Sequence, residues 1–289
     1  MNIPITGHTK LTALLGSPVS HSLSPRMHNE AFKALGLDYV YLCFDIKEEQ
    51  LSSVTRAFRE MGVRGFNLTM PNKNKMVEFA DELSPAARLI GAVNTVVNDN
   101  GRFICHNTDG VGYMRAVKDA GYDITGKTIT LLGGGGAATA ICAQAALDGV
   151  DTIHVFLRKT SRFWQRTCLL AENIQKELPC RVLIHEQQDS RALSEALAES
   201  ALLVNATSVG MAPNTEASLI EDPALFHPDL IVSDVIYNPQ ETRLLRLARE
   251  AGCRVFNGSY MLLYQGAEAF RLWTGQDMPV DLIKETVFA

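Results

Sequence analysis

One stretch, residues 127–149, limits the folds open to this chain more than any other. Thr128–Leu132 are β-branched residues or leucines without polar alternation, a pattern typical of a parallel strand that is buried on both faces. Four glycines follow without a break. Ala137–Leu147 then form a small-residue segment typical of a helix, which Gly149 ends. The stretch therefore predicts a strand, a tight glycine turn and a helix.

The glycine turn has the spacing of a dinucleotide-binding motif, with Gly133, Gly135 and Ala138 in its three small-residue positions. The first glycine would make the turn, and the second would let a pyrophosphate approach the backbone. The third position would let the helix pack on the strand, with its N-terminal N–H groups aimed at the phosphate. A mobile surface loop is the alternative interpretation of four glycines.

Composition narrows the class of protein. With 289 residues the chain is long for one core, so we expect two domains. A net charge of −5 gives no indication of a nucleic-acid partner. The sequence has no apolar run of about 18 residues, so we expect no membrane span. The N-terminus lacks the segments of a signal peptide. The six cysteines are scattered without a C-x-x-C pair, which indicates a reduced, cytoplasmic protein without a metal site.

Alternating strand and helix patterns predict an α/β protein with two domains. Residues 1–108 together with 259–289 are expected to form an N-terminal α/β substrate and catalytic domain. Residues 109–258 are expected to form a Rossmann-type, doubly wound dinucleotide-binding domain.

Several local predictions concern the residues around the expected site. Ser24 is expected to cap the helix that follows it, Lys73 to stand at the start of a helix, and Asp109 to cap another helix. Strands are expected over 92–97 and 102–106, joined by a tight turn. An amphipathic helix is expected over 239–251.

The loop after the second Rossmann strand bears on the choice of cofactor, because a residue there meets the adenosine ribose. An acidic side chain favours the 2′-hydroxyl of NAD, and cations accommodate the 2′-phosphate of NADP. Arg158 and Arg162 lie in this loop, with no acidic residue between them. We therefore expect NADP over NAD. Use of both cofactors stays open, and a solvated basic loop is the alternative.

Loops at the expected carboxyl ends of strands carry the candidate chemistry, since open α/β sheets bind ligands there. Ser22 and Ser24 could hold a carboxylate or hydroxyl ligand, although helix capping also explains a serine at this place. Lys73 and Asp109 would make an ammonium–carboxylate pair able to exchange the proton of an alcohol. Asn94 lies in a third polar loop. Spacing alone does not select this pair over others.

Seven motifs follow one another along the chain. They are S-x-S-P at Ser22–Pro25, N-x-T-x-P-x-K at Asn67–Lys73, G-A-V-N-T at Gly91–Thr95, N-T-D-G at Asn107–Gly110, L-L-G-x-G-G-A from Leu131, N-A-T-x-x-G-M at Asn205–Met211 and G-x-x-M-L-x-x-Q-G-A at Gly258–Ala267. In type and order they resemble the motifs of the shikimate dehydrogenase family, and the resemblance covers nearly the whole chain. The S-H-S-L-S-P, M-P-N-K and W-T-G stretches are most similar to the quinate/shikimate dehydrogenase branch.

The resemblance implies reversible NAD(P)-dependent oxidation of shikimate to 3-dehydroshikimate, in chorismate and aromatic amino-acid biosynthesis, or of quinate to 3-dehydroquinate in quinate use. It implies that Lys73 and Asp109 are the catalytic pair, without deciding which is the formal base. The implied substrate ligands are Ser22, Ser24, Thr69, Asn94, Tyr237 and Gln265, and the implied cofactor ligands are Gly133, Gly135, Gly136, Ala137, Arg158, Arg162 and Gly258.

Two departures from the family pattern matter. The glycine loop has Gly134 where the family usually has alanine, a change that is expected to be harmless. The other departure is in the loop after the second Rossmann strand and concerns the cofactor. The NADP-type motif N-R-T-x-x-R has Leu157 and Lys159 in place of its asparagine and threonine, while both arginines are kept. The NAD-accepting branch usually places an aspartate in this loop, where this chain has Thr160. The branch resemblance thus favours NAD or both cofactors, and the residues themselves favour NADP.

Two other functions stay open at this point: a dehydrogenase of another cyclic hydroxy acid, and a non-catalytic nucleotide-sensing Rossmann protein. The presence of both Lys73 and Asp109 argues against the sensor, which has no need of a proton-transfer pair. The expected partner is a small-molecule substrate, without nucleic acid or membrane. The oligomeric state is not determined by the sequence, and a homodimer is one option.

Overall fold

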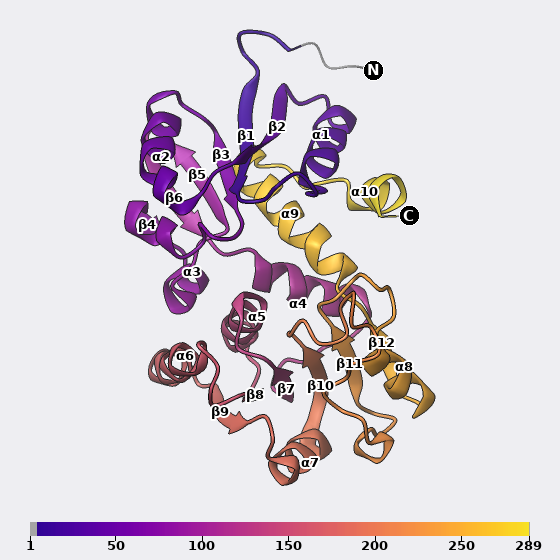
Figure 1. Ribbon diagram of the computed structural model, residues 1–289. Coiled ribbons are helices and arrows are strands. Elements are labelled where there is room, and N and C mark those ends of the chain that lie inside the picture. The colour runs from indigo at the N-terminus through magenta and orange to yellow at the C-terminus, as the bar shows by residue number, and fades with distance from the viewer. Residues whose placement is uncertain (1–4, 289) are drawn as a thin grey trace. The chain divides into compact units, whose positions relative to one another are not determined.

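The structure is a computed structural model that describes residues 5–288, so the first four residues of the predicted N-terminal domain lie outside it (Figure 1). The N-terminal segment, which lacks the features of a signal peptide, also begins outside the described residues. The chain divides into two compact units, Met1–Gly112 with Leu263–Ala289, and Tyr113–Leu262. Each unit contains one six-stranded sheet, as expected for an α/β protein with two domains.

The first unit has a mixed sheet with the strand order β2-β1-β3-β5-β6-β4. Strands β1, β2 and β3 run parallel, and β5 and β6 form an antiparallel hairpin that pairs with β3. The hairpin turns at Asn100 and Gly101, whose φ angles are 53° and 88°. Positive values at both turn residues match the twist of the flanking strands. The bounds are β1 Lys10–Gly16, β2 Tyr39–Asp45, β3 Gly65–Leu68, β4 Glu82–Leu83, β5 Thr95–Asp99 and β6 Arg102–His106.

Within residues 5–288, six α-helices belong wholly or partly to the first unit, and two of them, α4 and α9, cross its boundary with the second unit. Their bounds are α1 Ser24–Ala34, α2 Leu51–Glu60, α3 Pro85–Ile90, α4 Asp109–Asp119, α9 Ser259–Thr274 and α10 Val280–Val287, with short 3₁₀ helices η1 Glu48–Gln50 and η2 Lys75–Phe79.

The structure corrects three local predictions in this unit. Helix α1 is capped at Leu23, without a side-chain hydrogen bond, so the prediction that Ser24 is its N-cap was wrong. Lys73 lies in a turn that precedes η2, and the helix expected at this lysine is only this 3₁₀ helix. Asp109 is the first residue of α4, and its own N–H is held by Asn107 Oδ1 at 3.2 Å.

The second unit has an all-parallel sheet in the order β12-β11-β10-β7-β8-β9, which is the doubly wound arrangement that the sequence predicts. Its four central strands, β7, β8, β10 and β11, are buried, while the edge strands β9 and β12 are partly exposed; β7 and β8 have the predicted bounds. The strands are β7 Thr128–Leu132, β8 Thr152–Leu157, β9 Arg181–Glu186, β10 Ser200–Asn205, β11 Ile231–Asp234 and β12 Arg254–Phe256.

The helices of the second unit alternate with its strands along the chain. Helix α8 begins at Arg243 rather than at Pro239, because the side chain of Thr242 accepts a hydrogen bond from the N–H of Leu245 and caps the helix there. The bounds are α5 Gly136–Leu147, α6 Trp164–Glu177, α7 Ser190–Glu199 and α8 Arg243–Glu250, with the 3₁₀ helix η3 Pro223–Leu225.

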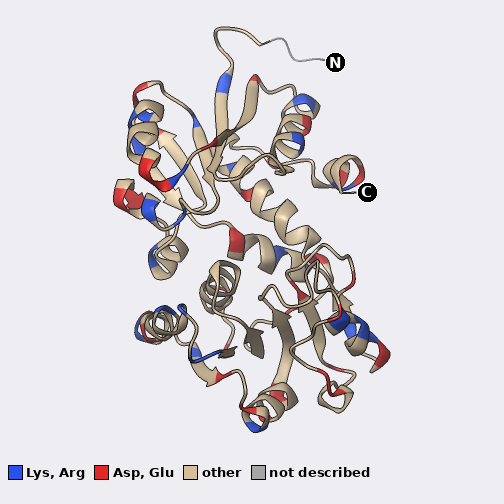
Figure 2. Ribbon diagram, in the orientation of Figure 1, with Lys and Arg blue, Asp and Glu red and all other residues tan. Residues whose placement is uncertain are grey.

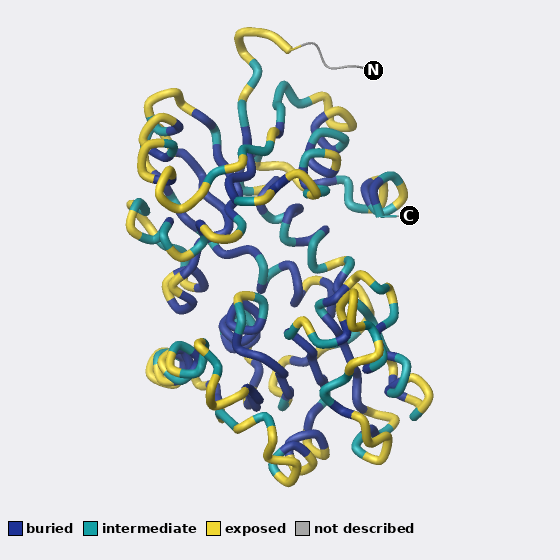
Figure 3. The backbone as a smooth tube through the Cα atoms, in the orientation of Figure 1, coloured by how far each residue is buried: buried dark blue, intermediate teal, exposed yellow. Residues whose placement is uncertain are grey.

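Each unit has its own core: the central strands of each sheet are buried, and so is most of helix α5 in the second unit (Figure 3). Basic and acidic residues are interspersed along both units in the described part of the chain (Figure 2). Across residues 5–288, no helix combines the length and the apolar composition needed to cross a membrane.

Candidate functional site

The topology of the first unit gathers the polar loops at one edge of its sheet. Strands β1 and β3 are parallel, so the loops that follow them leave from the same edge. Strand β5 pairs antiparallel with both β3 and β6, with Thr95 opposite Asn67 and His106. Strand β5 therefore begins, and β6 ends, where β3 ends. This edge holds the predicted residues from all four strand ends.

Lys73 and Asp109 form an ion pair at this edge, with Nζ and Oδ2 2.6 Å apart. Their side chains are 29% and 16% exposed, so the pair is shielded from bulk water and still accessible to a ligand. The carbonyl of Lys73 accepts a hydrogen bond from the N–H of Val93 at 2.8 Å, which fixes the turn to the segment before β5. Residues 36 positions apart are thus brought within hydrogen-bond distance.

Asn94 fixes the carboxylate of this pair from the other side. Its Nδ2 donates to Asp109 Oδ1 at 2.8 Å and to Thr108 Oγ1 at 3.1 Å. Its Oδ1 accepts from the N–H of Thr108 at 2.7 Å and from the hydroxyl of Thr95 at 3.0 Å. Asn94 is 2% exposed and fully engaged within the protein. Its bonds set the direction in which Asp109 presents Oδ2 to Lys73.

The serine turn and Thr69 lie in the loops after β1 and β3. Ser22 Oγ accepts a hydrogen bond from the N–H of Ser24 at 3.2 Å, so the first serine stabilises the turn that precedes α1. Ser24 is buried and Ser22 is half-buried. Thr69 is half-buried against Gly16, where an added Cβ would collide with its γ-methyl group. The close approach of these two loops requires glycine at that position.

The other two predicted substrate ligands lie in different parts of the chain. Gln265 is half-buried on α9, within the first unit. Tyr237 belongs to the second unit, in the loop after β11, and is 49% exposed.

The four glycines of the turn in the second unit fall into two kinds. Two are required because a side chain would collide there, and two face open space. Gly133 has φ of +114°, and a Cβ there would lie 2.8 Å from the carbonyl oxygen of Ala206. A Cβ on Gly134 would approach Leu157 and Thr167 at 2.6 and 2.7 Å, so even alanine requires those side chains to shift. A Cβ on Gly135 or Gly136 would meet no atom within 4 Å. These two glycines face open space, where a pyrophosphate can approach.

Helix α5 begins beside this space. Its N-cap is Gly135, which offers no side-chain hydrogen bond to the first N–H groups of the helix. Ala137 lies in the first turn, and Ala138 is buried against the sheet. An uncapped helix N-terminus is suited to a phosphate, because its free N–H groups and the helix dipole both favour an anion.

The two arginines of the loop after β8 are both exposed. The guanidinium of Arg162 lies over the ring of Phe163, 4.8 Å from its centroid, and the carbonyl of Arg158 accepts from the N–H of Ser161 at 2.8 Å. No acidic side chain in the described part of the chain pairs with either guanidinium. Both charges therefore remain available to an anionic group.

Gly258, the last predicted cofactor residue, has a steric reason to be glycine. A Cβ at this position would collide with the backbone of Val235, so the loop before α9 packs directly on the chain after β11. This contact is sufficient to explain the glycine without a ligand.

Sequence reasoning missed the buried carboxylate that organises the loop around Tyr237. Asp234 is 0% exposed and accepts hydrogen bonds from Asn205 Nδ2 at 2.9 Å, Thr242 Oγ1 at 2.8 Å and the N–H of Ile236 at 2.9 Å. Burial raises the pKa of Asp234, and these donors act against the rise. The N-A-T motif was the available signal, because its asparagine ties β10 to this carboxylate.

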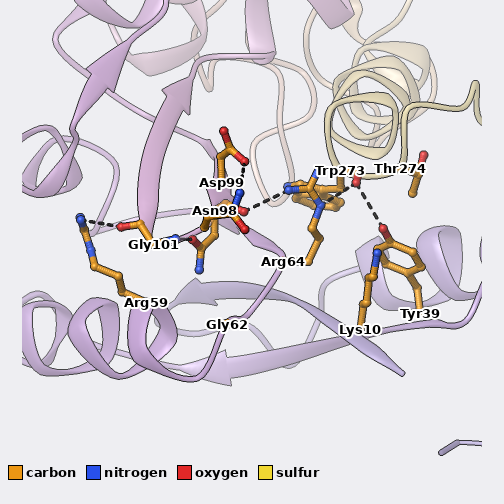
Figure 4. A pocket seen from close by; sticks show the side chains of 11 residues that line it. Lys10, Tyr39, Arg59, Gly62, Arg64, Asn98, Asp99, Gly101, Trp273 and Thr274 are labelled. Carbon is orange, nitrogen blue, oxygen red and sulfur yellow. Dashed lines mark hydrogen bonds between the residues drawn. The ribbon is translucent and has the colours of Figure 1, made fainter. Parts of the chain in front are cut away.

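A cavity of about 570 Å³ lies at the opposite edge of the first sheet, where β1 and β2 begin (Figure 4). Three cations line it, and the two arginines among them hold main-chain carbonyls. Arg64 donates through Nε to the carbonyl of Trp273 at 2.8 Å and through Nη1 to that of Asn98 at 3.0 Å. Tyr39 donates to the same Trp273 oxygen, and Arg59 to the carbonyl of Gly101. We therefore assign these residues to closing the end of α9 and the β5–β6 turn.

Comparison with known proteins identifies the family. The family described as "Shikimate dehydrogenase substrate binding domain" matches residues 14–96, and that described as "Shikimate 5'-dehydrogenase C-terminal domain" matches residues 258–288. A "Shikimate dehydrogenase (NADP(+))" of Listeria innocua is 52% identical over 284 residues, covering 98% of this chain and 97% of that protein. The chain belongs to the shikimate dehydrogenase family.

Solved structures of the shikimate dehydrogenase family share the whole fold. The shikimate 5-dehydrogenase of Listeria monocytogenes in complex with shikimate and NAD has a TM-score of 0.96 and 51% identity, covering 99% of this chain and 98% of that chain. A quinate dehydrogenase of Corynebacterium glutamicum in complex with NAD has a TM-score of 0.85 and 30% identity, covering 97% of this chain and 99% of that chain. The predicted family and fold class are confirmed.

Proposed function

We propose that this protein is an NAD(P)-dependent shikimate dehydrogenase, which oxidises shikimate reversibly to 3-dehydroshikimate. The observation that carries the proposal is the Lys73–Asp109 pair at the loop edge of the first sheet, in a chain that is 52% identical to a shikimate dehydrogenase (NADP(+)). An ammonium held 2.6 Å from a carboxylate can exchange the proton of a hydroxyl, as oxidation of an alcohol requires. This chemistry argues against the nucleotide-sensing alternative.

In the first unit, we propose one set of residues for proton transfer and another for substrate binding. Lys73 Nζ and Asp109 Oδ2 hold the proton that leaves the ring hydroxyl, and Asn94 keeps the carboxylate in place. Ser22, Ser24, Thr69, Gln265 and Tyr237 are proposed to bind the substrate's carboxylate and remaining hydroxyls. Asn94 stays a proposed substrate residue as well. Because Lys73 and Asp109 are coupled, the proton belongs to the pair rather than to either residue.

The residues of the second unit fit a dinucleotide. Gly135, Gly136 and Ala137 would hold its pyrophosphate at the start of α5, because the turn is open at these two glycines and the helix N-terminus is uncapped. Gly133 stays a proposed cofactor residue, whose positive φ makes the turn. The nicotinamide, when bound, accepts the hydride that leaves the carbon bearing the reacting hydroxyl. Gly258 is retained as a proposed cofactor residue, although its packing on Val235 supports a structural role equally well.

We propose NADP as the preferred cofactor. Arg158 and Arg162 are exposed, follow the second Rossmann strand and have no acidic residue between them. A 2′-phosphate offers such arginines charge-assisted hydrogen bonds, which a 2′-hydroxyl cannot match. The relative at 52% identity is named for NADP(+), while the Listeria monocytogenes structure holds NAD, so use of both cofactors stays within the proposal.

A steady-state assay with two substrates and two acceptors tests the function. Shikimate or quinate is offered with NAD+ or NADP+, and the absorbance of the reduced nicotinamide is followed. We expect shikimate with NADP+ to give the highest kcat/KM. If correctly folded protein shows no turnover in any of the four reactions, the proposed function is wrong. The protein would then be a dehydrogenase of another cyclic hydroxy acid or a nucleotide sensor.

Removing the two loop arginines tests the cofactor proposal. In the double variant Arg158→Ala with Arg162→Ala, we expect kcat/KM for NADP+ to fall by about 10- to 100-fold, the size of one or two charge-assisted hydrogen bonds. The value for NAD+ should change by less than about threefold, because NAD lacks the phosphate. Lys176→Ala, which removes an exposed cation on α6, is the matched control. Equal losses with both acceptors would contradict a phosphate-reading role.

Quinate is the second candidate substrate, favoured by the 30% identical quinate dehydrogenase. Quinate differs from shikimate by a hydroxyl at the carbon that bears the carboxylate. Serine at both positions 22 and 24 fits shikimate best. Four expectations stay predictions: membership of the quinate/shikimate branch, a cytoplasmic location, a homodimer, and domain boundaries at 108/109 and 258/259.

A further inference from the structure

Tyr41 is a buried polar residue that no functional motif of the sequence includes. It lies in β2 and is 0% exposed. Its hydroxyl donates to Asn67 Oδ1 at 2.8 Å. The ring stacks on His28, with centroids 4.5 Å apart and planes inclined by 13°. Asn29 holds its main chain, with one bond to the Tyr41 N–H at 2.9 Å and one from its own Nδ2 to the Tyr41 carbonyl at 3.0 Å. The hydroxyl therefore has little freedom to move.

The hydroxyl of Tyr41 holds the Asn67 amide oxygen, while the carbonyl of Asn94, which can only accept, sets which way the amide faces. Asn67 Nδ2 faces β5 and donates to the carbonyl of Asn94 at 3.1 Å and to Thr95 Oγ1 at 2.9 Å. Asn67 is 5% exposed, so water cannot readily replace either set of bonds. A rotated amide would place an N–H group against Tyr41 and an oxygen against the Asn94 carbonyl.

These bonds continue to the catalytic pair. Asn67 holds the main chain of Asn94, and Asn94 Nδ2 donates to Asp109 Oδ1 at 2.8 Å. The Thr95 hydroxyl, which Asn67 also contacts, lies 3.0 Å from Asn94 Oδ1. A displacement of Asn67 therefore acts on both the backbone and the side chain of the residue that orients the carboxylate.

Tyr41 keeps its proton under assay conditions. Burial raises its pKa well above the ordinary value of 10.0. The phenol therefore stays protonated and donates to Asn67 throughout the pH range of an assay.

We propose that Tyr41 is a positioning residue for the reaction, whose hydroxyl fixes the Asn67 amide and, through Asn94, holds the Asp109 carboxylate opposite Lys73. The inference rests on the proposed dehydrogenase function and deepens it. It differs from a purely structural role of Tyr41 in the aromatic core, because a core residue would affect stability without selectively slowing the chemical step.

The test is Tyr41→Phe, which removes only the hydroxyl and keeps the ring that packs on His28. Tyr39→Phe is the matched control: it removes a hydroxyl from the same strand, one that bonds the carbonyl of Trp273 rather than Asn67. With shikimate and NADP+, we expect kcat of Tyr41→Phe to fall about tenfold, as for one lost hydrogen bond that leaves a buried acceptor unpaired, with little change in KM for NADP+. Tyr39→Phe should keep the kcat of the wild type.

Two further readouts exclude a general loss of stability. The acidic limb of the kcat–pH profile should move to higher pH in Tyr41→Phe, since a loosened Asn94 donates less to the carboxylate. In an Asn67→Ala background, Tyr41→Phe should lower kcat no further, because the residue through which it acts is gone. A wild-type kcat and pH profile in Tyr41→Phe, or equal losses in both tyrosine variants, would overturn the proposal.

The wild-type assay separates the two proposals. If the wild type oxidises shikimate and Tyr41→Phe matches it, only the positioning role fails. If the wild type oxidises no substrate tested, the proposed function fails, and a crystal structure of Tyr41→Phe decides the positioning role alone. A displaced Asn67 amide and a broken Asn94–Asp109 hydrogen bond would support it; an unchanged network would overturn it.

Discussion

Lys73→Ala is expected to lower kcat for shikimate oxidation by roughly a thousandfold, the range in which a positioned proton-transfer group contributes. The ammonium lies 2.6 Å from Asp109 Oδ2, so its removal takes away one of the two groups that exchange the hydroxyl proton. KM should rise less than kcat falls, because the proposed serine, threonine and glutamine ligands are untouched. Steady-state kinetics with shikimate and NADP+ measures both constants.

The matched control for this variant is Lys75→Ala. Lys75 lies two positions along the same segment and pairs with Glu78 at 2.8 Å rather than with Asp109. We expect Lys75→Ala to retain turnover, and both variants to unfold at nearly the temperature of the wild type, because partly exposed ion pairs contribute little to stability. Near-normal turnover in folded Lys73→Ala would show that the pair is not the proton-transfer group.

The parts of the fold that the sequence predicts well are those with a local physical signal. Thr128–Leu132 and Thr152–Leu157 are strands with the expected bounds, because buried parallel strands are continuous runs of branched residues. The turn at Asn100 and Gly101 was predicted because few residue pairs adopt its positive φ angles. Helix ends were harder. The start of α8 depends on the Thr242 side chain, whose capping role competes with the equally plausible Pro239.

The site illustrates the opposite case, in which the decisive contacts join distant parts of the chain. Spacing did not select Lys73 and Asp109, because they come from different strand ends and meet only through the order of β3, β5 and β6. The family resemblance supplied that choice. Neither source indicated Tyr41, since an aromatic residue in a strand is expected to serve the core or the surface of a sheet. The proposed role of Tyr41 depends on the hydrogen bond that its hydroxyl donates to Asn67 Oδ1, and this bond can be found only in the three-dimensional structure.

His28 is expected to make the stability of the protein fall with decreasing pH. It is 0% exposed and lies within an aromatic cluster formed by Phe32, Tyr41, Phe270 and Trp273. Neither ring nitrogen has a hydrogen-bond partner among the described residues. Burial lowers the pKa of His28 from 6.5 to about 3, because no neighbour compensates the charge of the imidazolium.

The sign follows from proton binding in the two states. Between pH 6.5 and about 3 the unfolded chain binds a proton at His28 that the folded chain does not. The free energy of unfolding is therefore highest above pH 6.5 and falls as pH decreases through this window, by up to about 1.4 kcal/mol per pH unit. His106 and His185, whose pKa values burial also lowers, add to the slope in the same direction.

His28→Phe isolates the contribution of this residue, because it keeps an aromatic ring in the cluster and removes the titrating group. Denaturant unfolding at several pH values between 7 and 4.5 should show a slope shallower than that of the wild type by about one proton. His8→Gln removes an exposed histidine and should keep the wild-type slope. A His28→Phe slope equal to that of the wild type would mean that this imidazole is protonated in the folded core, and that the cluster around it opens to water.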